Sequence, residues 1–249
     1  MRLRIVACAA LTALACGPIQ AQEAREWEMQ ITPYAWISGL SGHLGAIPGL
    51  PASGVDLSFG DILDDLDVAG MLMASARNGP WVIYLDTTYV RTSSSEQLGG
   101  VVFDRVEIES ETTNFALAVG RTITQTPQSS VDAYFGARAW WLKNTFDLRG
   151  VGGGKSSRSE RANWIDPLVG IAVRHSASER WDLFGNAEVG GFGVGADLEW
   201  SVMAGATYSI TEAFGVSVGW RYLAVDYDKG GIVYDVNQSG PVLGATFRF

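Results

Sequence analysis

The two histidines of this chain are the residues best suited to acid–base catalysis. His43 follows Ser41 by two positions, and His175 stands next to Ser176 and close to Glu179. A histidine beside a hydroxyl can activate it as a nucleophile, as in an esterase or an acyltransferase. No acid adjoins Ser41 and His43 in the sequence to orient the imidazole. We therefore expect solvated loop residues and predict no catalytic site.

Two groups of carboxylates could hold a divalent cation, because hard cations prefer carboxylate oxygens. The first group shares one face of a predicted strand and consists of Glu107, Glu109 and Glu111. We favour a strand extension that these charges keep soluble. The second group surrounds a predicted helical turn opened by Asp61, and its spacing lacks the glycine of a calcium-binding loop; its members are Asp61, Asp64, Asp65 and Asp67. We predict no metal site and no cofactor.

A third set of charged residues is more informative, because each member stands on the polar side of a segment whose other side is apolar. A closed sheet would bring these acids and arginines together in its interior, where they could form ion pairs. That interior would be either a cross-linked plug or a narrow pore whose charges set ion preference. The predicted lining residues are Asp86, Arg138, Asp166, Arg174, Asp182, Glu188, Glu199, Arg221 and Arg248.

Alternation of apolar and polar residues defines the elements that must position these charges. In the segment 131–141, apolar residues occupy the odd positions, whereas Asp132, Tyr134, Gly136 and Arg138 lie between them. The same period of two recurs in the segments 27–37, 165–174, 181–189, 198–208, 214–222 and 240–249. This period indicates strands, and about ten residues is the length that a tilted strand needs to cross a bilayer.

The connections between these segments alternate in length. Short ones follow residues near 78, 124, 176 and 210, and longer ones rich in Gly and Ser cover 39–67, 92–104, 149–161 and 228–236. Short turns on one side and long loops on the other are typical of transmembrane barrels, with the short turns in the periplasm. We place a short strand at 55–59 and a helical turn at 60–67 within the first long loop.

The predicted fold is all-β, a closed antiparallel transmembrane β-barrel of about ten strands. Eight strands would result if two of the ten merged, and twelve if segments of the first long loop counted as strands. The ten strands begin near residues 27, 67, 80, 105, 131, 163, 180, 196, 213 and 237.

Residues 1–21 are interpreted as a secretory signal peptide, and residues 22–249 as a single barrel domain. A basic start precedes an apolar run of about a dozen residues, which is too short to span a bilayer. Both cysteines, Cys8 and Cys16, lie in this leader, so the mature chain would have no thiol for catalysis or disulfides. The residues before Cys16 resemble a lipoprotein lipidation box, which leaves its lipidation open.

The acidic balance of the chain excludes some partners. Without the leader and its two arginines, 16 basic residues face 27 acidic ones, a net charge of −11. Nucleic acids require a basic surface, so we expect no nucleic-acid binding. Beyond the leader, no stretch approaches 18 consecutive apolar residues, which excludes a transmembrane helix. A closed barrel remains, because it satisfies every backbone hydrogen bond internally.

Lipid rather than a second sheet is expected to cover the apolar faces. A soluble sheet would expose Lys, Glu, Thr and Ser on its polar face, whereas this chain carries Gly, Tyr and opposite charges there, which suits a crowded interior. Aromatic residues also gather at the segment ends, where the two bilayer interfaces would lie. They are Trp27, Trp81, Trp141, Trp164, Trp181, Trp200, Tyr208, Tyr222 and Phe249.

The last six residues, GATFRF, resemble the carboxy-terminal targeting signal of Gram-negative outer-membrane β-barrel proteins. In that signal a glycine precedes two alternating aromatic residues, here Gly244, Phe247 and the terminal Phe249. Val242 stands where the family usually has a polar residue. The stretches TPYAWISGLSG and FGDILDDLD resemble uncharacterised small outer-membrane barrels, and the whole chain is distantly similar to the outer membrane protein W and porin-like groups.

This resemblance implies a location in the outer membrane, contact with its lipid and lipopolysaccharide, and recognition by the barrel-assembly machinery. The expected function is that of a structural envelope component or a narrow porin-like channel for small solutes. The alternatives are a lipid-modifying enzyme that uses His43 and a surface adhesin or receptor that acts through its long loops. The sequence gives no indication of a solute or of the oligomeric state.

Overall fold

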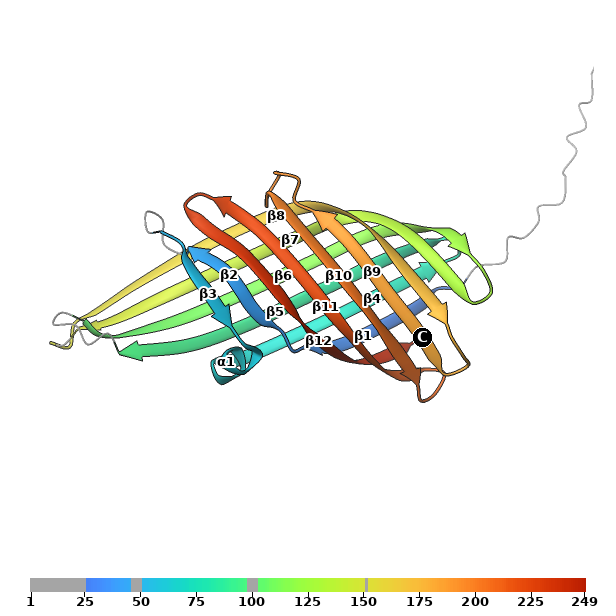
Figure 1. Ribbon diagram of the computed structural model, residues 1–249, viewed down its shortest axis with the longest axis horizontal. Coiled ribbons are helices and arrows are strands. Elements are labelled where there is room, and N and C mark those ends of the chain that lie inside the picture. Colours follow the sequence, from blue (N-terminus) through green and yellow to red (C-terminus); the bar gives the residue numbers. More distant parts are fainter. Residues whose placement is uncertain (1–25, 46–50, 98–102, 151) are drawn as a thin grey trace, which may run out of the picture.

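The computed structural model of this protein describes residues 26–45, 51–97, 103–150 and 152–249. They contain one antiparallel sheet of twelve strands, and ten of these close into a barrel, as predicted (Figure 1). The barrel strands are β1 (Glu28–Trp36), β4 (Leu66–Asn78), β5 (Trp81–Gln97), β6 (Phe103–Gln125), β7 (Ser129–Gly150), β8 (Lys155–Ser176), β9 (Trp181–Gly190), β10 (Leu198–Ser209), β11 (Phe214–Lys229) and β12 (Ile232–Arg248).

The barrel closes where the last strand meets the first. β12 pairs with β11 on one side and with β1 on the other, in a register that places Phe247 opposite Ile31. The amide of Phe249 donates to the carbonyl oxygen of Met29 at 2.9 Å, and the amide of Met29 donates to that of Phe249 at 3.1 Å. The edge strands of an open sheet carry unpaired backbone groups, which are unstable in hydrocarbon. Closure of the barrel removes these edges.

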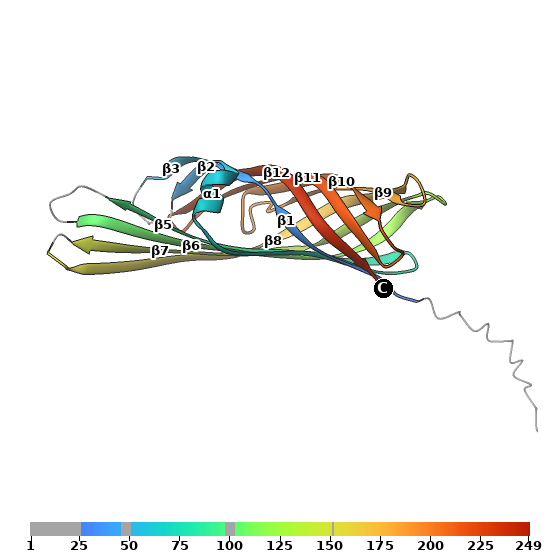
Figure 2. The ribbon, with the colours of Figure 1, turned by 90° about the horizontal axis from the view of Figure 1, so that it is seen from below.

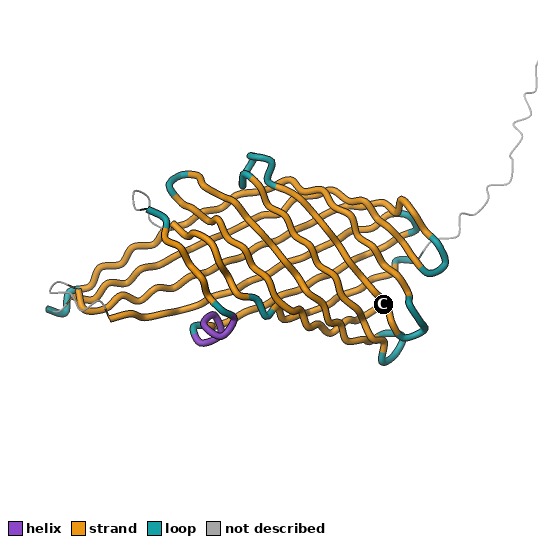
Figure 3. The backbone as a smooth tube through the Cα atoms, in the orientation of Figure 1, coloured by secondary structure: helices purple, strands orange, loops and turns teal. Residues whose placement is uncertain are grey.

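The first strand of the barrel starts and the last strand finishes at the same end, which also carries the turns after β4, β6, β8 and β10 (Figure 3). We call this end the periplasmic end, following the expectation that short turns face the periplasm, and the opposite one the extracellular end. The strands run obliquely between the two ends, as tilted barrel strands do (Figure 1).

The two faces of the wall have the predicted polarity. On β7, Phe135 points outward and is 68% exposed, whereas Arg138 and Trp140 point inward and are each 1% exposed. Ile165 on β8 is 61% exposed, and its neighbour Asp166 is fully buried. An outer face of exposed large apolar side chains is stable in lipid and unfavourable in water.

The predicted aromatic residues lie on the outer face with one exception. Trp27, Trp81, Trp181 and Trp200 are between 38% and 54% exposed. Trp164, which the sequence reasoning placed at a bilayer interface, is only 7% exposed and packs inside the barrel. The reason is parity, because Trp164 precedes the outward-facing Ile165 and therefore points to the opposite face.

Three predicted long loops are largely strands. β5 continues to Gln97 and β6 starts at Phe103, while β7 and β8 leave a connection only between Gly150 and Lys155. β11 and β12 are joined by a tight turn at Gly230 and Gly231. Figure 2 shows β5 to β8 extending beyond the other strands as a flat projection. Backbone hydrogen bonds between these strands continue beyond the apolar, lipid-facing part of the barrel, because they do not depend on lipid.

The first predicted long loop also contains strands, β2 (Gly39–Gly45) and β3 (Ser53–Leu57), which lie outside the closed barrel. β2 continues along β12 where β1 ends. The helix α1 (Phe59–Asp64) starts after Ser58, whose hydroxyl accepts from the amide of Asp61 at 3.2 Å. The prediction that Asp61 opens the helix is therefore displaced by three residues, because Ser58 is the better placed cap.

The predicted signal peptide, residues 1–21 with Cys8 and Cys16, lies outside the described residues. In the part of the chain that the structure describes, no helix has the length and apolar character needed to span a membrane.

We expect Ala137→Arg, which puts a charge on the lipid-facing side of β7, to destabilise the folded barrel by about 2–4 kcal/mol. The matched control is Thr145→Arg, on the same face of β7 but in the extracellular extension, where we expect little change because water solvates the charge. Chemical unfolding of both variants in lipid vesicles measures the difference. Equal stabilities would contradict the position assigned to the bilayer.

Candidate functional site

A unit of buried ion pairs lies in the barrel interior. Arg138 on β7 donates to Glu199 on β10 at 3.2 Å and to Glu188 on β9 at 2.5 Å. The side chains of Arg138 and Glu199 are each 1% exposed. A buried arginine is stable when carboxylates both neutralise it and accept its hydrogen bonds. These three residues therefore link three strands through the lumen.

A second ion pair connects the opposite side of the barrel. Arg221 on β11 donates to Asp86 on β5 at 2.6 Å and to the Tyr34 hydroxyl on β1 at 2.8 Å. Tyr34 donates in turn to Asp86 at 2.8 Å, which completes a triangle. The Arg221 guanidinium also lies 5.0 Å from the ring centre of Trp36, in cation–π range.

The loop between β9 and β10, residues 191–197, folds into the lumen and is held by Asp166. One carboxylate oxygen of Asp166 accepts from the amide of Ala196 and the other from the indole of Trp164, both at 2.7 Å. A Cβ atom at Gly195 would lie 2.5 Å from Asp166, so the close approach requires glycine there. Sequence reasoning missed this inward loop, although its run of glycines, GGFGVGAD, was a visible signal.

An aromatic and aliphatic cluster fills the lumen on the extracellular side of these charges. Trp164 stacks on Tyr227 with ring centres 3.9 Å apart, and Trp140 lies 5.7 Å from Trp164. The indole of Trp140 donates to Glu199 at 2.8 Å and so joins the cluster to the ion pairs. Leu223, Val225 and Val236 are each 1–2% exposed in the same cluster. The extracellular half of the lumen is therefore packed with side chains.

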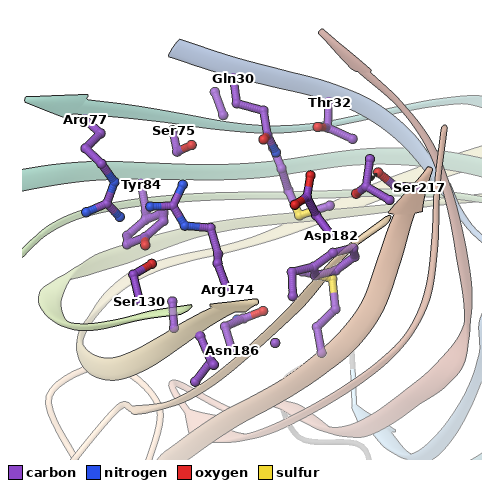
Figure 4. A pocket seen from close by; sticks show the side chains of 18 of the residues that line it. Gln30, Thr32, Ser75, Arg77, Tyr84, Ser130, Arg174, Asp182, Asn186 and Ser217 are labelled. Carbon is purple, nitrogen blue, oxygen red and sulfur yellow. Dashed lines mark hydrogen bonds between the residues drawn. The ribbon is translucent and has the colours of Figure 1, made fainter. Parts of the chain in front are cut away.

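The periplasmic half of the lumen contains a cavity of about 760 Å³ (Figure 4). Its walls include the turn residues 125–130 and the terminal Phe249, and its inner end reaches Asp86 and Arg221. The lumen is thus a cup that opens at the periplasmic end.

The nine predicted lining residues divide into two groups. Six line the cavity: Asp86, Arg174, Asp182, Glu188, Arg221 and Arg248. Arg138, Asp166 and Glu199 are buried in the packed layer beyond it. Arg248 forms an ion pair with Asp182 at 3.0 Å, near the cavity mouth. Arg174 has no carboxylate within 4.0 Å among the described residues, and Asp166 bonds to Trp164 and Ala196 rather than to an arginine.

Sequence reasoning did not identify a further buried cluster around Asp132. This carboxylate on β7 is fully buried and accepts from Arg77 on β4, Tyr84 on β5 and Thr122 on β6. The alternation of 131–141 already placed Asp132 on the inner face. The sequence of β4 did not indicate its inner face in the same way, because small residues and methionines interrupt the alternation of apolar and polar residues.

The histidines lie apart from these clusters. His43 is on the exposed face of β2, a strand rather than the expected loop, and its Nδ1 lies 3.8 Å from Asp235 on β12. An acid therefore does stand beside His43, although their side chains are 64% and 50% exposed. His175 at the periplasmic end of β8 contacts the Ser129 hydroxyl at 2.8 Å.

The glutamates of β6 lie on the projecting sheet and face basic residues. Glu107 pairs with Arg149 at 2.8 Å, and Glu109 and Glu111 lie within 3.5 Å of Lys143. Within the described ranges, no group of three or more potential ligands is arranged to hold a metal ion.

The carboxylate of Asp61 accepts hydrogen bonds from the hydroxyl and the amide of Ser58, and these bonds lower the pKa of Asp61 below its usual value.

Acidic residues crowd the extracellular rim at the ends of β10 to β12. Partial burial raises the pKa of Asp226, and the negative charges of Asp235, Asp197 and Asp228 raise it further. A carboxyl group whose pKa is higher in the folded than in the unfolded protein destabilises the folded state at neutral pH. This destabilisation disappears below the pKa of the unfolded state, about 3.9.

We expect Arg138→Ala to destabilise the barrel by about 3–5 kcal/mol, because it leaves Glu188 and Glu199 buried without their cation. The control removes all three charges at once, as Arg138→Met with Glu188→Gln and Glu199→Gln, and should recover much of the loss. The temperature at which the folded band on a gel converts to the unfolded band measures both. Wild-type stability of Arg138→Ala would show that this arginine is not buried between carboxylates.

We expect Asp226→Asn to stabilise the barrel at pH 7, because it removes an unfavourable negative charge. The gain should shrink as the pH falls to about 4, where the wild-type carboxyl is itself protonated. Asp104→Asn, on β6, is the control, because it removes one negative charge from a strand outside this acidic rim. Unfolding temperatures across this pH range test the prediction, and a gain that grows toward low pH would contradict it.

Comparison with known proteins identifies the fold. No protein-family model matches the sequence, and no curated protein matches it. The outer membrane protease OmpT from Escherichia coli is structurally similar over 90% of this chain and 97% of its own, with 11% identity and a TM-score of 0.53. The translocator domain of the autotransporter NalP from Neisseria meningitidis matches 89% of this chain over 88% of its own, with 12% identity and a TM-score of 0.44.

A third similar structure is Ail, the attachment invasion locus protein of Yersinia pestis, with 14% identity and a TM-score of 0.33 over 90% of this chain and 99% of its own. At these identities the likeness to OmpT concerns the fold and not the activity. The closed sheet, the exposed apolar outer face and this fold together identify the chain as an outer-membrane β-barrel.

Proposed function

We propose that this protein is a structural component of the outer membrane whose lumen is closed by its own side chains. The observation that carries the proposal is the packed layer of Arg138, Arg221 and Glu199, each at most 2% exposed, between the periplasmic cavity and the aromatic cluster. A water-filled pore would leave such charges accessible to solvent along a continuous path. Here they satisfy one another, as expected of a plug.

The closed lumen disfavours the narrow porin-like channel that was the other expected function. The ion pairs connect β5, β7, β9, β10 and β11 through the interior, and the hydrogen bonds of Tyr34 add β1. Removing one partner of an ion pair would leave a buried charge without its counter-charge, so the arrangement resists opening. The lining residues then serve to cross-link the barrel rather than to conduct ions.

Export and assembly are part of the same proposal. Residues 1–21 would act as a cleaved leader, and Gly244, Phe247 and Phe249 would form the signal for the barrel-assembly machinery. In support, Phe249 exchanges backbone hydrogen bonds with Met29 at the seam, and Phe247 packs on Phe214 with ring centres 5.2 Å apart. Outer-membrane lipid and lipopolysaccharide would contact the apolar belt and the charged extension above it.

We also propose that the protein is not an enzyme. His43 and Asp235 lie on the outer face of a strand pair, and their side chains are 64% and 50% exposed. Catalysis by such a pair would lack the water-excluding site that strengthens electrostatic stabilisation. Unchanged lipid A mass spectra after overexpression are the expected result, and a modification lost in His43→Ala would contradict it.

We expect lipid vesicles that contain this protein to retain potassium ions as well as protein-free vesicles do. The amount of folded protein is measured on the same sample from the gel band that shifts on boiling, so that poor insertion cannot mimic closure. Vesicles with a general porin at equal density serve as the positive control. Potassium efflux that rises with the amount of folded protein would overturn the closed lumen.

A further inference from the structure

The periplasmic cavity contains one arginine that the fold does not neutralise. Four arginines line this cavity, and three have carboxylate partners: Arg77 with Asp132, Arg221 with Asp86, and Arg248 with Asp182. Arg174 on β8 has neither an ion pair nor a hydrogen bond to its guanidinium within the described part of the chain, and its Nε atom is buried without a partner. Leaving a guanidinium unpaired in a partly desolvated cavity is unfavourable.

The surroundings of Arg174 suit an anion. Figure 4 shows its guanidinium directed into the cavity, toward Tyr84 and Arg77 and above Ser130. Tyr84 lines the same cavity, and its hydroxyl donates to Asp132 at 2.5 Å. A carboxylate placed here could accept two parallel hydrogen bonds from the guanidinium, and the Ser130 hydroxyl lies on the same side of the cavity.

The rest of the cavity suits an apolar body. Met73, Met203, Leu168 and Phe184 line it, and its volume of about 760 Å³ lies in the range of small-molecule sites. Glu28 and Glu212 also line the cavity, and both are exposed. These negative charges disfavour ligands with several negative charges more than those with one. The packed layer closes the extracellular side, so a ligand would enter from the periplasm.

We propose that this cavity binds a small monocarboxylate with an apolar body, and that Arg174 holds its carboxylate. The inference does not depend on the proposed structural function, because a closed barrel and a conducting one could both carry the site. It assigns Arg174 a binding role, whereas the other three arginines of the cavity hold the barrel together.

Titration calorimetry on the folded protein in lipid nanodiscs tests the proposal, with 3-phenylpropionate as the probe. We expect saturable binding of this acid, and binding weaker by about tenfold or more in Arg174→Gln, because a charge-assisted bidentate contact is lost. The control is Arg121→Gln, on the outer face near the same end of the barrel, which should bind like the wild type. The heat-dependent gel shift establishes that both variants are folded.

Two further probes separate the carboxylate from the apolar body. The neutral 3-phenylpropanol should bind about tenfold more weakly than the acid, and phenyl phosphate, largely dianionic at pH 7.5, should also bind more weakly. Equal binding of the alcohol, unchanged affinity in Arg174→Gln, or no binding of the acid at about 10 mM would each overturn the proposal. Tighter binding of phenyl phosphate would overturn the assignment to a monocarboxylate.

Discussion

Closure of the sheet between β1 and β12 is the constraint on which the rest of the structure depends. Hydrocarbon offers no hydrogen-bond partners, so each backbone amide and carbonyl in the bilayer must find one within the sheet. The reciprocal backbone hydrogen bonds between Met29 and Phe249 pair the first strand with the last residues of the chain. Once the sheet is closed, every second side chain must enter a narrow lumen, and the outer residues must be apolar.

The contents of the lumen follow from that geometry. A ten-stranded barrel has little room, so the polar residues of the inner face cannot all be solvated and must satisfy one another. Arg138 and Arg221 do so with Glu188, Glu199 and Asp86, and Asp166 uses its carboxylate to fix the inward loop. The layer divides the lumen into a packed extracellular half and a periplasmic cup, and the proposed function and the proposed ligand site rest on that division.

The sequence allowed accurate prediction wherever a residue obeyed a period of two. The outward position of Ile165 and the inward position of Asp166 followed directly. The barrel has ten strands, which agrees with the prediction of about ten, for which eight and twelve had been alternatives. The same alternation places Trp164 on the inner face. Its assignment to a bilayer interface relied on its residue type alone and was wrong. The extensions of β5 to β8 were mistaken for loops, because Gly- and Ser-rich composition mimics a loop while cross-strand hydrogen bonds form whatever the side chains are.

The sequence alone thus determined the fold class, the lipid-facing side of most strands and nine of the inward charges, because these depend on local alternation. Only the tertiary structure decided which charges meet. Arg138 and Glu199 are 61 residues apart, and their contact depends on barrel diameter, strand stagger and the inward path of residues 191–197. For the same reason the sequence could not show that Arg174 lacks a carboxylate, since its surroundings come from strands distant along the chain.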